Sequence, residues 1–168
     1  MSAVIKTTTP FVIESVLITA LEATGAEPVV ATEQVMKSHN HIKDIQVGDI
    51  LTNRSDYFGV QLFRFAENRW ILRHDSDEMN GRITSSLASK HYKRVGDFLQ
   101  LVGKAYEIAY QQHLEILAEQ ERALLEEERK KRVEATRQQS IIKAKAQGYS
   151  VKETRVGGQI QLVLTRTV

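Results

Sequence analysis

The sequence predicts an α+β protein with a small antiparallel or mixed sheet, two strand–helix units and a long protruding helix or helical hairpin. Three observations predict this class. The length of 168 residues favours one domain with room for a second small element. Two segments, 57–74 and 149–166, have the apolar alternation and turn residues of β-hairpins. Between them, residues 104–147 contain neither Gly nor Pro and consist mostly of strong helix formers.

The first strand–helix unit lies at the start of the chain. Val4–Thr8 is rich in β-branched residues, which favour strands. Thr9 and Pro10 fit an N-cap followed by proline at the first helical position, and Gly25 fits a helix-ending glycine. The apolar residues between these signals recur at helical spacing: Ile13, Val16, Leu17, Ala20 and Leu21.

Strand patterns follow this helix. Residues 28–31 suggest a return strand and residues 45–51 another short strand, whereas residues 33–41 are ambiguous. The hairpin over 57–74 turns at Ala66–Arg69.

The closing hairpin turns at Gly157-Gly158, because glycine permits the positive φ angles of a two-residue hairpin loop. Residues 75–93 suggest a polar loop or a short irregular helix.

Composition excludes several classes of protein. An apolar fraction of 42% with only 2 Pro and 9 Gly excludes a wholly disordered or collagen-like chain. The absence of Cys excludes a disulfide scaffold, a catalytic thiol and a Cys-based metal site. No apolar run approaches the ~20 residues of a membrane span, and the first residues lack a signal-peptide pattern. We therefore expect a cytoplasmic protein without a membrane segment.

The predicted helix contains a block of balanced charge. Between Ala118 and Ser140, 12 of 23 residues are charged, six of each sign. One straight helix over 94–147 would be about 80 Å long at 1.5 Å per residue. The absence of turn residues favours this straight helix, and a helical hairpin remains the alternative. We expect three parts: an α+β core (1–111), a charged helical arm (112–140), and the helix end with a hairpin that completes the core (141–168).

Leucines in the arm predict association. Steps of four and three residues from Tyr110 meet Leu114 and Leu117 first, and the regular apolar pattern then fails across Glu121 to Gln138. We expect a homodimer whose contact residues are Leu114, Leu117, Leu124 and Leu125. An outer charged contact with another protein would use Arg129, Lys130, Lys131 and Arg132. The alternative is a solvated spacer held helical by pairs such as Glu126 with Lys130, Glu127 with Lys131 and Glu128 with Arg132.

Candidates for chemistry are few. His39 and His41, with Asp44 and the pair His74-Asp75, are the only plausible metal grouping, and isolated loop histidines are more common than ligands. The acidic group Asp75, Asp77 and Glu78 fits a solvated loop better than an acid–base site. Neither a phosphate-binding glycine loop nor a nucleophile motif is present. We therefore expect a protein that is not an enzyme and has no metal or cofactor.

The alternative function is nucleic-acid binding. Arg64, Arg69 and Arg73 lie among aromatic residues that include Trp70, and the basic run 129–132 would add phosphate contacts. A net charge of only +2 weakens this alternative.

Several segments resemble a family of small proteins of cyanobacterial and plastid genomes, defined as a domain of unknown function. Its opening pattern is matched by Val4-Ile-Lys-Thr7 and Ala20-Leu-Glu-Ala-Thr-Gly25. Its middle is matched by Asp56-Tyr-Phe-Gly-Val60, Trp70-Ile-Leu72, and Phe98-Leu-Gln-Leu-Val102 with Tyr106. Its closing signature is matched by Ala144-Lys-Ala-Gln-Gly-Tyr-Ser-Val151 and Gly158-Gln-Ile-Gln-Leu-Val-Leu-Thr-Arg166. The resemblance implies the α+β fold but no activity, and this chain departs from the family by an insertion of about thirty residues near 112–140.

Overall fold

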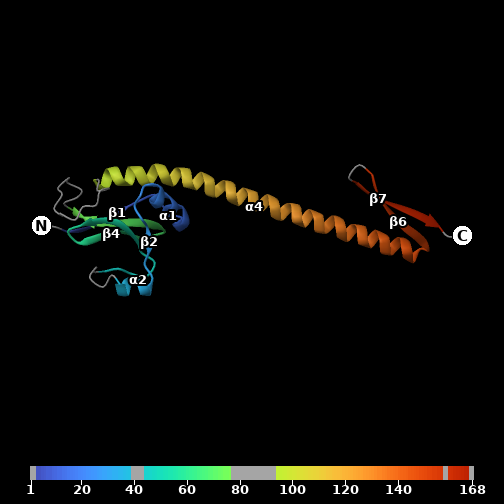
Figure 1. Ribbon diagram of the computed structural model, residues 1–168, viewed down its shortest axis with the longest axis horizontal. Coiled ribbons are helices and arrows are strands. Elements are labelled where there is room, and N and C mark those ends of the chain that lie inside the picture. Colours follow the sequence, from blue (N-terminus) through green and yellow to red (C-terminus); the bar gives the residue numbers. More distant parts are fainter. Residues whose placement is uncertain (1–2, 39–43, 77–93, 157–158, 167–168) are drawn as a thin grey trace. The chain divides into compact units, whose positions relative to one another are not determined.

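A computed structural model describes residues 3–38, 44–76, 94–156 and 159–166 of the chain (Figure 1). Its contacts divide the chain into two units, Met1–Glu115 and Ile116–Val168. In chain order the elements are β1 (Val4–Thr8), α1 (Glu14–Ala23), β2 (Val29–Val30), α2 (Glu33–Ser38), β3 (Ile50–Asp56), β4 (Gly59–Ala66), β5 (Arg69–Asp75), α4 (Val95–Ala146), β6 (Tyr149–Val156) and β7 (Gln159–Arg166).

The first unit contains a five-stranded antiparallel sheet in the order β1-β5-β4-β3-β2. The predicted α+β class is confirmed. The turn between β4 and β5 lies at Glu67 and Asn68, whose φ angles of 54° and 61° are both positive, as a type I′ hairpin loop requires. This turn lies where the sequence predicted it, and it pairs Phe65 with Trp70 and Phe63 with Leu72.

One face of the sheet carries the main core. Helix α1 contributes Leu17, Ala20 and Leu21, and the first turns of α4 contribute Val95, Phe98 and Val102. These side chains pack against Phe63, Trp70 and Leu72 and other residues of the sheet. Of the five apolar residues predicted at helical spacing, Val16, Leu17, Ala20 and Leu21 form the buried stripe of α1, whereas Ile13 precedes the helix.

The ends of α1 differ in how well the sequence predicted them. The predicted N-cap at Thr9 is wrong: α1 is preceded by Ile13, and the Thr9 hydroxyl instead donates to the backbone carbonyl of Trp70. The predicted end at Gly25 is confirmed, with φ at +74° and its N–H donating to the Glu22 carbonyl. The next N–H, from Ala26, donates to the Leu21 carbonyl, which completes a Schellman motif.

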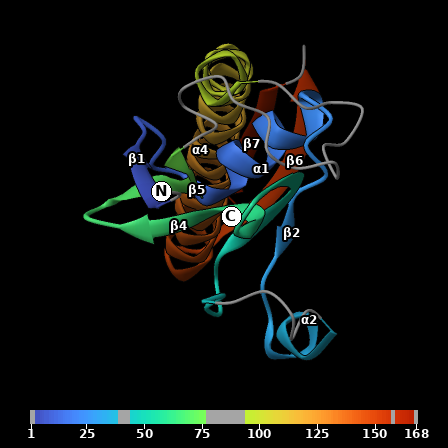
Figure 2. The same cartoon turned by 90° about the vertical axis from the view of Figure 1, so that its left-hand side faces the viewer.

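A second, smaller cluster contains Ala31, Ile45, Leu51 and Leu62, with side chains of α2 packed against it. Figure 2 shows α2 apart from α1 and α4. Helix α2 lies in the segment 33–41, where the sequence pattern was ambiguous. The predicted strand over 28–31 contains β2. Of the predicted strand over 45–51, only Ile50 and Leu51 belong to a strand, the start of β3.

Helix α4 is uninterrupted over its 52 residues, so the helical-hairpin alternative is excluded. Beyond it, β6 and β7 form the predicted hairpin, with Val151 opposite Leu164. We expected this hairpin to complete the core. Among the described residues, its strands pair with each other in a sheet of their own. Most of the segment 75–93, predicted as a loop or irregular helix, lies outside the described residues.

Candidate functional site

The leucines predicted to mediate association lie on α4 and are all exposed. The exposed fractions are 41% for Leu114, 46% for Leu117, 63% for Leu124 and 57% for Leu125. At about 100° per residue, these four side chains lie within roughly 100° around the helix axis. We call these four residues the leucine row. No described residue of the chain buries it.

Some other exposed apolar side chains of α4 lie away from the leucine row, whereas those of Tyr110 and Ile142 lie on its side of the helix. Ile116 is 54% exposed, yet it follows Glu115 and projects about 100° from Leu117, its neighbour in sequence. Ile108 and Val133 are likewise exposed and off the row. The four leucines therefore differ from these residues by sharing one side of the helix, where Glu121 alone separates Leu117 from Leu124.

The basic run at 129–132 is held in ion pairs along the helix. Lys131 Nζ lies 2.7 Å from Glu127 Oε1, and Arg132 Nη2 lies 3.7 Å from Glu128 Oε2, as the spacing predicted. Arg129 pairs instead with Glu126, three residues earlier, at 3.5 Å. All these side chains are well exposed, so each pair contributes at most a few tenths of a kcal/mol, about 0.3–0.5. The run stays available to a partner.

Two arginines of the alternative nucleic-acid surface bind acidic groups of the same chain. Arg64 donates from Nε and Nη2 to the two oxygens of Asp49, at 2.8 and 2.6 Å. These hydrogen bonds are the main cause that raises the pKa of the Arg64 guanidinium, against a smaller opposing effect of burial. Arg64 and Arg73 also both donate to the backbone carbonyl of Asp44, at 2.6 and 3.0 Å. We call Asp44, Asp49, Arg64 and Arg73 the arginine clamp.

The aromatic half of that alternative surface is largely buried. Trp70 is only 3% exposed and Phe63 is fully buried, so neither ring face is open for base stacking. Phe65 is half exposed and meets Trp70 edge to face, with ring centroids 5.3 Å apart. Four residues were predicted for nucleic-acid binding: Arg64, Arg69, Trp70 and Arg73. Of these, only Arg69 is exposed and without a hydrogen-bond or ion-pair partner in the described part of the chain. This arrangement favours a structural role for Arg64, Trp70 and Arg73.

The candidate metal ligands are not gathered by the described structure. His39 and His41 lie outside the described residues, as do Asp77 and Glu78. The buried His74 donates from Nδ1 to the backbone carbonyl of Asp75, and its Nε2 lies 2.7 Å from Thr7 Oγ1. Within the ranges that the structure describes, no three His, Asp or Glu side chains could hold a metal ion.

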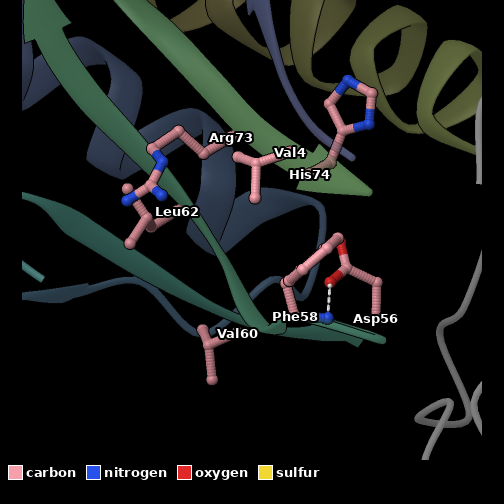
Figure 3. Close-up of a pocket in the computed structure, with 7 residues that line it drawn as sticks. All are labelled: Val4, Asp56, Phe58, Val60, Leu62, Arg73 and His74. Atoms are coloured by element: carbon pink, nitrogen blue, oxygen red, sulfur yellow. Dashed lines mark hydrogen bonds between the residues drawn. The ribbon is translucent and has the colours of Figure 1, made fainter. Parts of the chain in front are cut away.

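Figure 3 shows a small hollow where the turn between β3 and β4 approaches β1 and the end of β5. Its volume of about 30 Å³ is room for about one water molecule, whereas ligand sites enclose roughly 300–1,000 Å³. One oxygen of Asp56 accepts the N–H of Phe58 at 2.9 Å, and the other accepts the N–H of Asp75 at 2.7 Å. This carboxylate therefore holds the turn and the neighbouring strand.

Sequence reasoning missed a buried polar group beside this turn. Arg54 is almost wholly buried; its Nε donates to Gln61 Oε1 at 2.9 Å, and its guanidinium lies 4.0 Å over the Phe98 ring. Gln61 donates in turn to Asp56 at 3.3 Å. The sequence indicated this burial only weakly, because Arg54 follows Ile50 and Thr52 at every second position, on one side of a strand.

An apolar groove in the first unit also escaped sequence reasoning. It is lined by Phe11, Val12, Tyr106 and Tyr110, among others, and has a volume of about 530 Å³. The Tyr106 hydroxyl accepts the N–H groups of Val12 and Ile13, at 3.1 and 3.0 Å, which joins α4 to the start of α1. Tyr106 and Tyr110 are four residues apart and stack with ring centroids 6.4 Å apart. In the sequence, this spacing of the two tyrosines was the feature that could have indicated the groove.

Comparisons with family models, with curated proteins and with solved structures found no match to this chain. The resemblance to the cyanobacterial and plastid family stays a prediction. Within the described ranges, no helix combines the length and the apolar character that crossing a membrane requires.

Proposed function

We propose that this protein is a non-enzymatic interaction module that self-associates through the leucine row of α4 and binds another protein. The observation that carries the proposal is the exposure of four leucines along one side of a single helix, at 41–63%. Large apolar side chains that line up on a helix and stay open to water are typical of helix–helix interfaces.

The charge distribution supports the second part of the proposal. The basic run Arg129–Arg132 is exposed and follows three glutamates, so it presents both signs of charge to a partner. Charged groups of this kind direct association and select partners more than they add affinity. The nucleic-acid alternative draws less support, because the arginine clamp and the burial of Trp70 leave Arg69 as its one open residue among the four.

The full-length variant Leu117→Gln/Leu124→Gln tests the self-association. We expect the wild-type chain to show a dimer mass at micromolar concentration by sedimentation velocity. The variant should weaken the dimer at least about tenfold, because two apolar contacts in each copy are lost. Ile116→Gln is the matched control, since Ile116 is as exposed as the leucines but projects from another side of the helix. A monomeric wild-type chain at all concentrations would contradict the proposal.

A further inference from the structure

The second unit carries a longer helical row that includes part of the leucine row. Steps of four and three along α4 trace the residues Leu117, Glu121, Leu124, Glu128, Lys131, Ala135, Gln138 and Ile142, which we call the α4 seam. Every one of these residues is exposed, and Ile142 has 65% of its surface open. An exposed row of this length has the geometry of a coiled-coil interface, yet its centre is charged.

We propose that the α4 seam pairs with the α4 seam of a second copy of this chain, running antiparallel and centred between Arg129 and Lys130. This inference rests on the self-association proposed above and names its geometry. In this register each of the eight seam residues meets one of matching character, whereas Leu114, one step beyond the seam, would lie near Lys145 of the second copy. The four layers, each formed twice, are Leu117 with Ile142, Glu121 with Gln138, Leu124 with Ala135, and Glu128 with Lys131.

Other pairings of two copies bring mismatched groups together. A parallel pair in register would set Glu121, Glu128 and Lys131 each against its own copy, giving three layers of like charge. An antiparallel pair centred near 126 would place Leu124 against Glu128, and one centred near 133 would carry Leu117 beyond the partner helix. The charged residues of the α4 seam weaken it as an ordinary coiled coil. In the proposed pair, however, they select one orientation and one register.

The pairing requires a second copy because one chain cannot make it alone. To pair the seam with itself, the chain would have to reverse near residues 129–130, and α4 is helical there without interruption. The ion pair between Arg137 and Glu153 of β6 does not block the seam. Arg137 projects about 200° around the helix from Ala135, at 100° per residue.

The flanks of the proposed pair carry one unfavourable contact. Glu127 and Glu134 would lie near each other across the interface. Each of these carboxylates already has a basic partner in its own chain: Lys131 lies 2.7 Å from Glu127, and Arg137 lies 2.8 Å from Glu134. These basic partners reduce the repulsion between the two carboxylates, although Lys131 is shared with the central layer.

Charge reversal in full-length chains tests the register. Glu128→Lys sets two lysines in the central layer, and Lys131→Glu sets two glutamates there. We expect each variant alone to weaken the dimer at least about tenfold, because like charges meet across the interface. An equimolar mixture should regain dimerisation as a heterodimer, because lysines at positions 128 and 131 of one chain then meet glutamates at positions 131 and 128 of the other. Mixing changes no contact within a chain, so helix destabilisation cannot explain the recovery.

Cysteine pairs test the orientation, which the absence of native Cys makes straightforward. In the proposed pair, position 124 of one copy lies against position 135 of the other. The two 124 positions are separated by 11 residues along the axis, about 16 Å. We expect an oxidised mixture of Leu124→Cys and Ala135→Cys chains to give the mixed disulfide, and Leu124→Cys alone to stay uncrosslinked.

The outcomes separate the two proposals. A wild-type dimer in which Leu124→Cys crosslinks to itself, or in which the mixed charge variants stay monomeric, would overturn the antiparallel register while leaving self-association intact. A wild-type chain that is monomeric throughout would overturn both. Recovery in the mixture together with the 124–135 disulfide would support the pairing.

Discussion

The Asp49 carboxylate joins the segment before β3 to strand β4. It accepts two hydrogen bonds from Arg64 and one from the N–H of Gln46, at 2.8 Å. Arg64 then reaches the backbone carbonyl of Asp44, which Arg73 also contacts. The arginine clamp thus fixes the segment before β3 to the neighbouring strands β4 and β5. Two of the arginines predicted for a nucleic-acid surface, Arg64 and Arg73, are thus paired in the fold with acidic residues of the same chain.

Asp49→Ala is expected to destabilise the protein by about 2–3 kcal/mol, because it removes three hydrogen bonds and leaves Arg64 without its charged partner. The Asp49 side chain is 2% exposed, whereas that of Arg64 is 21% exposed and can be partly rehydrated, which limits the cost. Urea unfolding measures the change. Arg69→Ala, at an exposed position, is the control and should lie within about 0.5 kcal/mol of wild type. Equal effects of the two substitutions would contradict the structural role of the clamp.

At the scale of elements, α4 is held helical mainly by its own sequence. Residues 104–147 lack helix breakers, and the exposed middle carries i,i+3 and i,i+4 ion pairs in place of a buried stripe. Near the C-terminal end of the helix, Glu134 accepts hydrogen bonds from Arg137 and Gln138 at 2.8 and 3.2 Å. Arg137 also donates to Glu153 of β6, so one arginine ties the helix to the hairpin.

The hydrogen bond from Arg137, and then that from Gln138, lowers the pKa of Glu134 below its ordinary value. A lowered carboxyl pKa means that the interaction is fully present above the unfolded-state pKa and is lost as the pH falls through the lowered value. We expect Arg137→Gln to raise the pKa of Glu134 back toward its ordinary value. Side-chain NMR titration of Glu134 measures this. Lys143→Gln removes an exposed positive charge farther along the same helix, outside the α4 seam, and should leave the pKa of Glu134 unchanged.

At the scale of the whole molecule, both apolar clusters lie within the first unit. Among the described residues, the members of the two clusters run from Phe11 to Tyr106, and none comes from the second unit. The strands β6 and β7 pair with each other and add no strand to the five-stranded sheet. We therefore expect the core to fold without residues 116–168.

We expect a chain truncated after Glu115 to unfold cooperatively and to be monomeric, because it keeps both clusters and loses most of the leucine row. Thermal unfolding followed by circular dichroism, together with sedimentation, measures both properties. In a pull-down, the partner protein retained by the full chain should not be retained by the truncated one. A truncated chain that is unfolded, or still dimeric, would contradict this division of roles.

The sequence by itself determined the elements whose signals are local. Most of helix α4 could be predicted because residues 104–147, 44 residues in all, contain neither Gly nor Pro. The β4–β5 hairpin could be predicted from the alternation of apolar residues, and the end of α1 from Gly25. In each case backbone propensity and turn chemistry act over a few residues. Only the tertiary structure decided how polar side chains are used. Thr9 bonds the Trp70 carbonyl instead of capping α1, Arg54 is buried against Phe98, and Arg64 binds Asp49. Each of these contacts joins residues that are distant in sequence, so it depends on how the strands pair and not on the pattern within any one of them.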